Sequence, residues 1–407
     1  MRVYRIFFFS LFFVLSYKEA MASFFLDVNQ LFRENECQDC DLSFLGIKKL
    51  DFAFADISGA DMRGSRIQES NFDQAILKEV DFIFGELSHA SLVRADFSKV
   101  DCRGCVADEV DFRFSNLKDT DFSYGNLSGS DFKASYIVGT NFNSADLKGA
   151  DFRFSILFGG DFREADLTDA LLPMVGLGSS DFSGATLKNV VFNNANLAGI
   201  NFAGVDLTGA SFKGADLTGA NFEGAVLDGV DFEGANLTQV NLSFAKGKGV
   251  NLETAILIEG DFSGSHLEGA NLRSANGFKG EFFKVLLNGA DLRGANFRES
   301  NMLHAHMEEV DARGIDASFA NLKRVRANKA NFAGSNFEST DIGSAKLIEA
   351  NLEGAVLTNA SLKKSKVMDA NLYNADVRNT IFELSVLCGA TMPSGLINHQ
   401  CDTIVPN

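Results

Sequence analysis

Bulky apolar residues recur at every fifth position along most of the chain. From Leu42 to Met392, 64 of the 71 positions in this phase hold Phe, Leu, Ile, Met or Val. A small or short-branched residue stands two positions before the apolar centre in 67 of these 71 units, and the phase never slips. The seven exceptions at the centre are Cys102, Ala107, Gly247, Gly277, Ala312, Ala317 and Ala327.

This period of five matches neither the 3.6 residues of a helical turn nor the two-residue alternation of an ordinary strand. It predicts a chain that turns a corner every fifth residue. Each unit then points one small and one large side chain inward, where they stack on the same positions of neighbouring coils. The pattern therefore predicts a solenoid and must be recognised before any local element is assigned.

The repeated units carry a family resemblance. Stretches such as Ala215-Asp216-Leu217-Thr218-Gly219 and Ala235-Asn236-Leu237-Thr238-Gln239 resemble the units of pentapeptide-repeat proteins. The resemblance covers residues 37–401 and implies an all-β fold, a right-handed quadrilateral β-helix with four repeats per coil. Residues 42–392 would then make about 18 coils and a rod on the order of 85 Å long. Opposed walls of Phe and of Leu would fill its axis without a channel.

The segments beside the repeats are expected to be caps, because the end coils of a solenoid expose unpaired backbone. Residues 23–41 form the N-terminal cap, with a short helix over 27–36 in which Val28, Leu31 and Phe32 are apolar. Residues 393–407 form the C-terminal cap. The CQDCDL motif at 37–42 and the segment 387–395 with the later Cys401 are similar to the opening and closing segments of exported family members.

Residues 1–22 are expected to be a signal peptide. Arg2 and Arg5 precede an apolar run from Ile6 to Leu15, and the small residues of 20–22 suit cleavage before Ser23. The run is too short for a permanent membrane helix, so we expect no transmembrane segment after signal removal. The protein is then periplasmic or extracellular. If Met21 is the true start, it is cytoplasmic instead.

The six cysteines, an even number, suit an oxidising compartment. Cys388 and Cys401 are placed to close the C-terminal cap, and Cys37 and Cys40 to bridge the N-terminal cap. Cys102 and Cys105 occupy inward positions and are either reduced core residues or a disulfide. A zinc ion shared by the two CxxC pairs is disfavoured, because the pairs lie over three coils apart and four ligands must approach one ion closely.

Charge and residue types argue against an enzyme. The chain has 54 acidic and 37 basic residues and a net charge of -17, so its field disfavours nucleic acid as a partner. Asp and Asn recur just before the apolar centres, which indicates solvated columns that support neighbouring strands rather than paired catalytic carboxylates. His304 and His306 lack a third ligand nearby. We predict no catalytic residue, no metal and no cofactor.

Two sets of outward positions are candidates for partner contact. One outward column, formed by every twentieth residue from 246 to 366, holds a basic or imidazole side chain in six of its seven places, and Leu286 is the exception. These side chains either contact an anionic partner or are neutralised by adjacent carboxylates. This basic ridge comprises Lys246, His266, His306, Arg326, Lys346 and Lys366. Two aromatic columns either contact a partner, a second copy or a membrane surface, or pack between coils. They comprise Phe44, Phe84 and Tyr124, and Phe54, Phe114 and Phe154.

These observations favour an exported, non-enzymatic rod that acts as a structural or protein-interaction scaffold. Its partner is an unknown protein or a second copy of the chain. The alternative is a DNA-mimicking, topoisomerase-binding protein of the cytoplasm. That activity is known for some members of the family, and an acidic rod of duplex-like width suits it. The expected signal peptide and the basic ridge both speak against this alternative.

Overall fold

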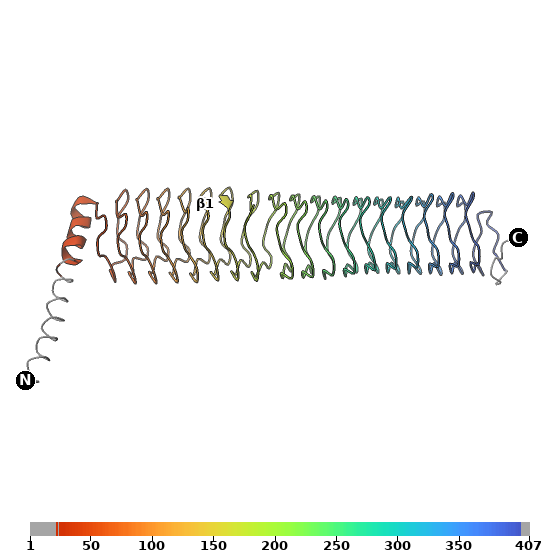
Figure 1. Ribbon diagram of the computed structural model, residues 1–407, viewed down its shortest axis with the longest axis horizontal. Coiled ribbons are helices and arrows are strands. Elements are labelled where there is room, and N and C mark those ends of the chain that lie inside the picture. The colour runs from red at the N-terminus through yellow and green to blue at the C-terminus, as the bar shows by residue number, and fades with distance from the viewer. Residues whose placement is uncertain (1–21, 23, 400–407) are drawn as a thin grey trace, which may run out of the picture. The chain divides into compact units, whose positions relative to one another are not determined.

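The computed structural model describes residue 22 and residues 24–399 (Figure 1). The chain divides into two compact units. Unit 1 holds the described residues up to Leu171 together with Ser179–Phe182, and unit 2 holds Leu172–Gly178 and the described residues from Ser183 onward. Each unit, taken by itself, is an all-β solenoid.

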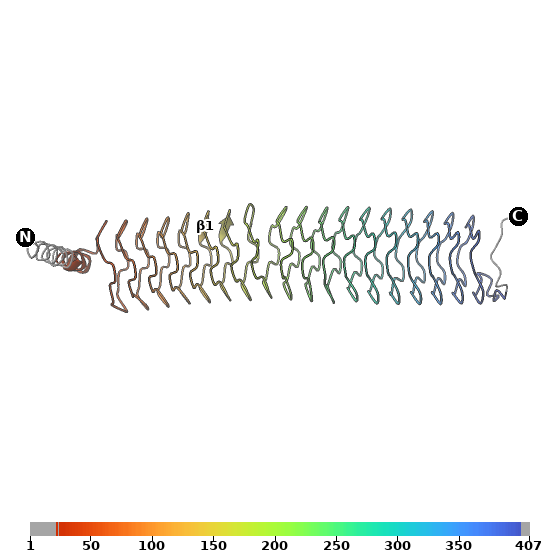
Figure 2. The same cartoon turned by 60° about the horizontal axis from the view of Figure 1, so that its bottom comes forward.

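Parallel β-bridges join positions that are twenty residues apart. In unit 1, Asp61 pairs with Asp81 and Asp81 with Asp101, while in unit 2 Asn251 pairs with Asn271. We call the twenty residues between bridge partners a coil, and the repeating coils of each unit can be followed from two sides (Figures 1 and 2). Two longer strands occur in unit 1, β1 (Tyr136–Val138) and β2 (Ile156–Phe158), and they pair in parallel.

The corner of each five-residue unit lies two residues after the apolar centre, where the backbone is left-handed. The angle φ is 59° at His89, 57° at Arg324 and 67° at Gly219. Residues other than glycine rarely adopt this conformation. The Asp or Asn before the centre supports the turn, as when Asp216 Oδ1 accepts a hydrogen bond of 3.1 Å from the backbone N–H of Thr218. Turn chemistry therefore explains why Asp and Asn recur before the apolar centres.

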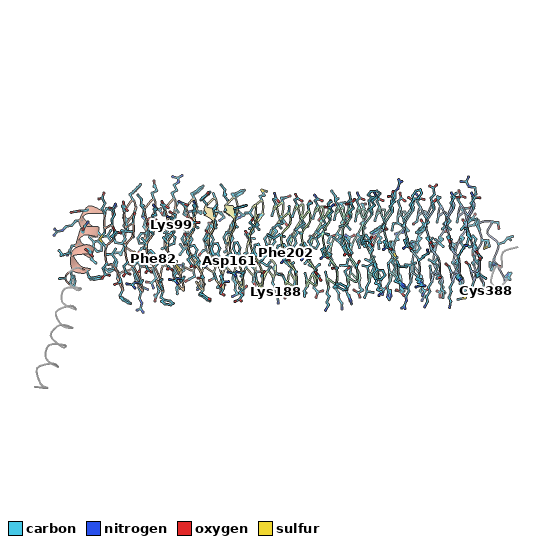
Figure 3. All side chains as sticks on the ribbon, in the orientation of Figure 1. Phe82, Lys99, Asp161, Lys188, Phe202 and Cys388 are labelled. Atoms are coloured by element: carbon cyan, nitrogen blue, oxygen red, sulfur yellow. A yellow bond between two sulfur atoms is a disulfide. The ribbon has the colours of Figure 1, made fainter. Side chains whose placement is uncertain are left out.

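The inward positions form columns of stacked side chains. In unit 2, the buried ring of Phe212 lies 5.2 Å from that of Phe192 and 5.1 Å from that of Phe232, measured between centroids. Phe82 in unit 1 and Phe202 in unit 2 are likewise fully buried, whereas Lys99 and Lys188 reach outward (Figure 3). A cavity among the apolar centres of unit 2 from Leu322 to Leu362 measures only about 10 Å³, so side chains fill the axis there.

Two departures from the repeat are informative. Gly277 stands at a centre position, where most units carry a bulky side chain. The ring of Phe297 fills the space that a side chain at Gly277 would need, since a Cβ added there would lie 2.7 Å from that ring. Ile47, which the period assigns to the interior, is 39% exposed, so that assignment was wrong. It lies in the first coil, where a coil follows it but none precedes it.

Residues 24–34 are helical and lie against the first coil (Figure 1). Leu31 is buried, and the ring centroids of Phe32 and Phe52 are 5.6 Å apart. The carboxylate of Asp27 accepts a hydrogen bond of 3.0 Å from the backbone N–H of Asp41. No helix in the described part of the chain is long and apolar enough to cross a bilayer.

The other end of the repeats folds back on itself. Thr391 and Ile397 form an antiparallel bridge, and the backbone N–H of Asn398 donates to the carbonyl of Ala390 at 2.8 Å. This reversal places residues 393–399 against the last coil.

Candidate interaction surfaces

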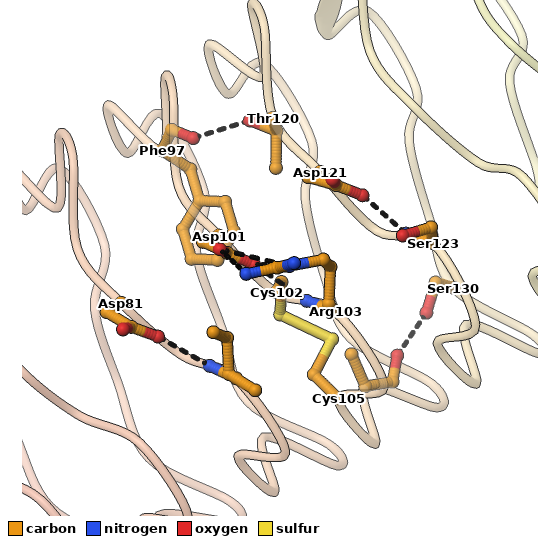
Figure 4. Close-up of a disulfide and its surroundings, with 12 residues drawn as sticks. Asp81, Phe97, Asp101, Cys102, Arg103, Cys105, Thr120, Asp121, Ser123 and Ser130 are labelled. Carbon is orange, nitrogen blue, oxygen red and sulfur yellow. Dashed lines mark hydrogen bonds and ion pairs between the residues drawn. A yellow bond between two sulfur atoms is a disulfide. The ribbon is translucent and has the colours of Figure 1, made fainter.

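Arg and Lys side chains form ion pairs with many of the Asp residues that precede the apolar centres; we call these columns of Asp residues the acidic columns. Arg103 Nε donates to Asp101 Oδ1 at 2.8 Å (Figure 4), and the Lys133 ammonium lies 2.7 Å from Asp131 and 3.1 Å from Asp151 on the next coil. The pKa of Asp161 is lowered by a side-chain hydrogen bond from Arg163, against the opposing effect of partial burial. Such carboxylates stay ionised and bound to neighbouring cations, which suits a structural role rather than proton transfer.

His304 and His306 stand two residues apart on one coil of unit 2. Within residues 22 and 24–399, no group of three or more His, Cys, Asp or Glu side chains is arranged to hold a metal ion. His304 Nε2 lies 3.4 Å from Arg324 Nη1. The pKa of His304 is lowered by partial burial and then by the charges of Arg324 and Lys284. Its surroundings are therefore cationic.

The cysteines are oxidised throughout the described chain, where none is free. Cys102 and Cys105, whose state the sequence left open, form a disulfide inside unit 1 with both residues buried (Figure 4). Cys37 and Cys40 form a second disulfide beside the helix. Cys388 is disulfide-bonded as well, while Cys401, its predicted partner, lies outside the described residues.

The basic ridge forms one continuous column in unit 2. Bridges run from Lys246 to His266 and onward, coil by coil, through Leu286, His306, Arg326 and Lys346 to Lys366. The one carboxylate close to a ridge side chain in the described chain is that of Glu268, 3.8 Å from His266 Nδ1. No ion pair joins the other ridge cations to a carboxylate among the described residues. These cations are Lys246, Arg326, Lys346 and Lys366.

The aromatic columns of unit 1 meet both the protein and the solvent. Phe44 and Phe84 are 77% and 72% exposed. Each ring also lies along the next coil, where a Cβ added to Gly64 or Gly104 would come within 2.8 Å and 2.7 Å of it. One side of each ring therefore packs on a glycine, and the other faces water. The remaining members are exposed by 55–70%: Tyr124, Phe54, Phe114 and Phe154.

Unit 1 exposes a further apolar group, of which the sequence analysis singled out Phe154 alone. Pairing of β1 with β2 places Tyr136 beside Ile156, and Phe154 and Phe158 flank that position on the same coil. All four side chains are exposed, by 41% at Tyr136 and by 54–67% at the others. We call them the β1–β2 patch. The signal was present, since Tyr136 and Ile156 stand where most units carry Asp or Asn.

Comparisons with known proteins agree with this repeat. A family model described as pentapeptide repeats matches more than half of the chain, over residues 55–92, 95–133, 135–172, 180–219, 206–243, 215–253, 248–276, 282–314 and 335–372. No curated protein matches the chain.

Solved structures with similarity include three repeat proteins. HetL, a pentapeptide repeat protein involved in heterocyst differentiation regulation in Nostoc sp. strain PCC 7120, is 19% identical over 91% of this chain and 98% of its own, with a TM-score of 0.19. QnrB1, a plasmid-mediated fluoroquinolone resistance protein, is 19% identical over 55% of this chain and 90% of its own (TM-score 0.26). A pentapeptide repeat protein of the Arabidopsis thaliana thylakoid lumen is 27% identical over 31% of this chain and 66% of its own (TM-score 0.11).

Proposed function

The chain belongs to the pentapeptide-repeat family, and from that premise we propose that it is an exported, non-enzymatic scaffold that binds another folded protein through the β1–β2 patch. We further propose the architecture that this family membership implies. It is a right-handed quadrilateral β-helix with four repeats per coil, about 18 coils in all, and caps at residues 23–41 and 393–407.

The observation that carries the proposal is the exposure of Phe154, Ile156 and Phe158 on one coil, with Tyr136 beside them on the preceding coil. Contiguous apolar side chains on a soluble surface usually mark contact with another molecule. Aromatic residues are also the side chains that contribute most to protein–protein binding. Phe114, which is also exposed, lies two coils before Phe154 in the same aromatic column.

Export is supported by two independent features. The signal-peptide pattern of residues 1–22 is one, and the oxidised state of the described cysteines is the other. Disulfides persist in oxidising compartments and are rare in the cytoplasm.

Two features of the described surface speak against the DNA-mimicking alternative. A mimic of duplex DNA needs an uninterrupted negative face. Here Arg103, Lys133 and similar residues hold the carboxylates of the acidic columns in ion pairs, and the basic ridge runs along unit 2.

Site-specific photo-crosslinking in cells that export the protein tests the partner. A photoreactive amino acid at Ile156 is compared with one at Ile256, which has the same repeat position in unit 2 and is also exposed. We expect a discrete heterologous adduct from position 156, none from 256, and loss of the adduct in the double variant Phe154→Ser/Phe158→Ser. Equal adducts at both positions, no adduct at 156, or an adduct with a second copy of this chain would each refute a heterologous partner at the patch.

The intact mass and cellular fraction of the protein test export separately. We expect a chain that begins at Ser23 outside the cytoplasm. A chain that begins at Met1 or Met21, found in the cytoplasm with free thiols, would overturn the localisation.

A further inference from the structure

An open hollow of about 430 Å³ lies on the surface of unit 2. It exists because Gly343 and Ser344 are small, whereas the matching positions of both neighbouring coils carry long basic side chains. Three consecutive coils line it: Lys323 and Arg324 on the first, Asp341, Gly343 and Ser344 on the second, and Ser361, Lys363 and Lys364 on the third.

The hollow has an excess of positive charge. Lys323 Nζ lies 2.7 Å from Asp341 Oδ2, and Lys363 Nζ lies 2.9 Å from Glu383 Oε2. Neither Arg324 nor Lys364 has a carboxylate partner among the described residues. Arg324 Nη1 lies 3.4 Å from His304 Nε2, which does not neutralise its charge, so two of the four cations have no carboxylate in the described chain to balance them.

The surroundings reinforce this charge. The ridge residues Arg326, Lys346 and Lys366 follow two residues after Arg324, Ser344 and Lys364 on the same three coils. His304, one coil before Arg324, has a pKa that is lowered by partial burial and then by the Arg324 charge. Like charges on adjacent strands are destabilising, so an anion bound among them would relieve repulsion.

We propose that this hollow binds a phosphate or sulfate group, held between Arg324 and Lys364 with the Ser344 hydroxyl beneath it. Neighbouring coils lie about 4.8 Å apart, so a group above Ser344 is one coil from each of the two cations and within reach of both side chains. A guanidinium can donate two parallel hydrogen bonds to such an oxyanion, and an ammonium adds a point charge. The coil backbone contributes little, because the N–H groups of Arg324 and Ser344 donate to carbonyls of the next coil.

The size of the hollow bears on the ligand. Its volume falls within the range of small-molecule sites, so the oxyanion can carry an organic substituent. A free ion, a soluble phosphate ester and a lipid headgroup share the same recognised group. The inference lies in unit 2 and depends neither on export nor on the protein partner proposed for unit 1.

The test uses the full chain and titration calorimetry with inorganic phosphate at low salt. The double variant Arg324→Gln/Lys364→Gln removes both ligands. A second variant, Gly343→Leu, fills the hollow without changing any charge, and the fold accepts Leu at this position because Leu303 occupies it two coils earlier. The control Lys279→Gln/Arg298→Gln makes the same change in net charge on exposed residues of unit 2 outside the hollow.

We expect phosphate binding that weakens by at least about tenfold in the double variant and in Gly343→Leu, and that stays within about twofold of wild type in the control. Vesicles of phosphatidylcholine with and without phosphatidic acid then distinguish the sources. Binding that requires phosphatidic acid and Arg324 assigns a lipid headgroup, whereas phosphate binding without vesicle binding assigns a soluble ligand. Absence of binding to both probes, or binding that both hollow variants leave unchanged, would overturn the proposal.

Discussion

Truncation of one stacked ring measures how strongly the inward columns hold the solenoid together. Phe212 is fully buried, stacks on Phe192 and Phe232, and meets Phe202 and Phe222 edge-on at centroid distances of 5.9 Å. The change Phe212→Ala removes about 2 kcal/mol of transfer free energy. A residual cavity on the order of 100 Å³, at about 24 cal/mol per Å³, adds roughly 2.4 kcal/mol.

The coil cannot collapse far into that cavity, because its backbone is tied to the next coil, as by the 2.7 Å hydrogen bond from Phe212 N–H to the carbonyl of Asp231. We therefore expect a loss of about 4–5 kcal/mol in the free energy of unfolding. The matched control is Phe244→Ala, which removes a ring that is 61% exposed, and it should cost less than about 1 kcal/mol.

Guanidinium unfolding followed by far-UV circular dichroism gives both the midpoint and the slope for each variant. The slope matters because solenoids can unfold in parts rather than in one step. A loss below about 1 kcal/mol for Phe212→Ala, or a loss equal to that of the control, would show that the stacked rings do not carry the stability assigned to them.

Three further predictions concern local features. The double change Cys102→Ser/Cys105→Ser should cost only about 2 kcal/mol in urea unfolding under non-reducing conditions, because the closed loop is very short; a loss near 5 kcal/mol would contradict this. The side-chain amide of Asn271 donates to Asn251 Oδ1 and to Glu253 Oε2 on the preceding coil, both at 3.0 Å. Asn271→Asp should therefore lower the free energy of unfolding of unit 2 by about 1–3 kcal/mol at neutral pH and by less near pH 3. An equal loss at both pH values would refute this. Hydrogen bonds from the Arg378 side chain and then from its backbone N–H lower the pKa of Asp376 to about 2. The stabilising contribution of the Asp376 carboxylate is therefore complete above pH 3.8, its ordinary pKa, and is lost as the pH falls through about 2. Titration of this carboxyl group by NMR should show a midpoint at about pH 2, and Arg378→Ala should raise that midpoint.

The inward and outward positions were predictable because a single backbone conformation recurs every five residues. Once the phase was known, Phe212 had to face the core and Lys346 the solvent. The ridge was predictable for the same reason, since positions twenty apart lie side by side. Ile47 is an exception in the first coil, which no coil precedes, whereas Leu42 of the same coil is buried, next to Asp41, whose backbone N–H donates to Asp27 of the helix.

Other features depend on three-dimensional detail that the period does not contain. The hollow exists because Gly343 and Ser344 have small side chains, whereas Lys323 and Lys363 on the neighbouring coils have long ones. Its shape therefore depends on the packing of three coils. The state of Cys102 and Cys105 also stayed open, because two inward thiols three residues apart are compatible with either oxidation state.

The twenty-residue spacing of the bridges limits how a chain of this kind can change in length during evolution. Insertion of one five-residue unit would preserve the inward and outward pattern, yet it would displace every later position by a quarter of a coil and break columns such as the one from Lys246 to Lys366. Insertion of twenty residues would leave each column intact and only lengthen it. Surface sites that span several coils therefore tolerate duplication or deletion of whole coils, and partial duplications should accumulate only where no such column is in use.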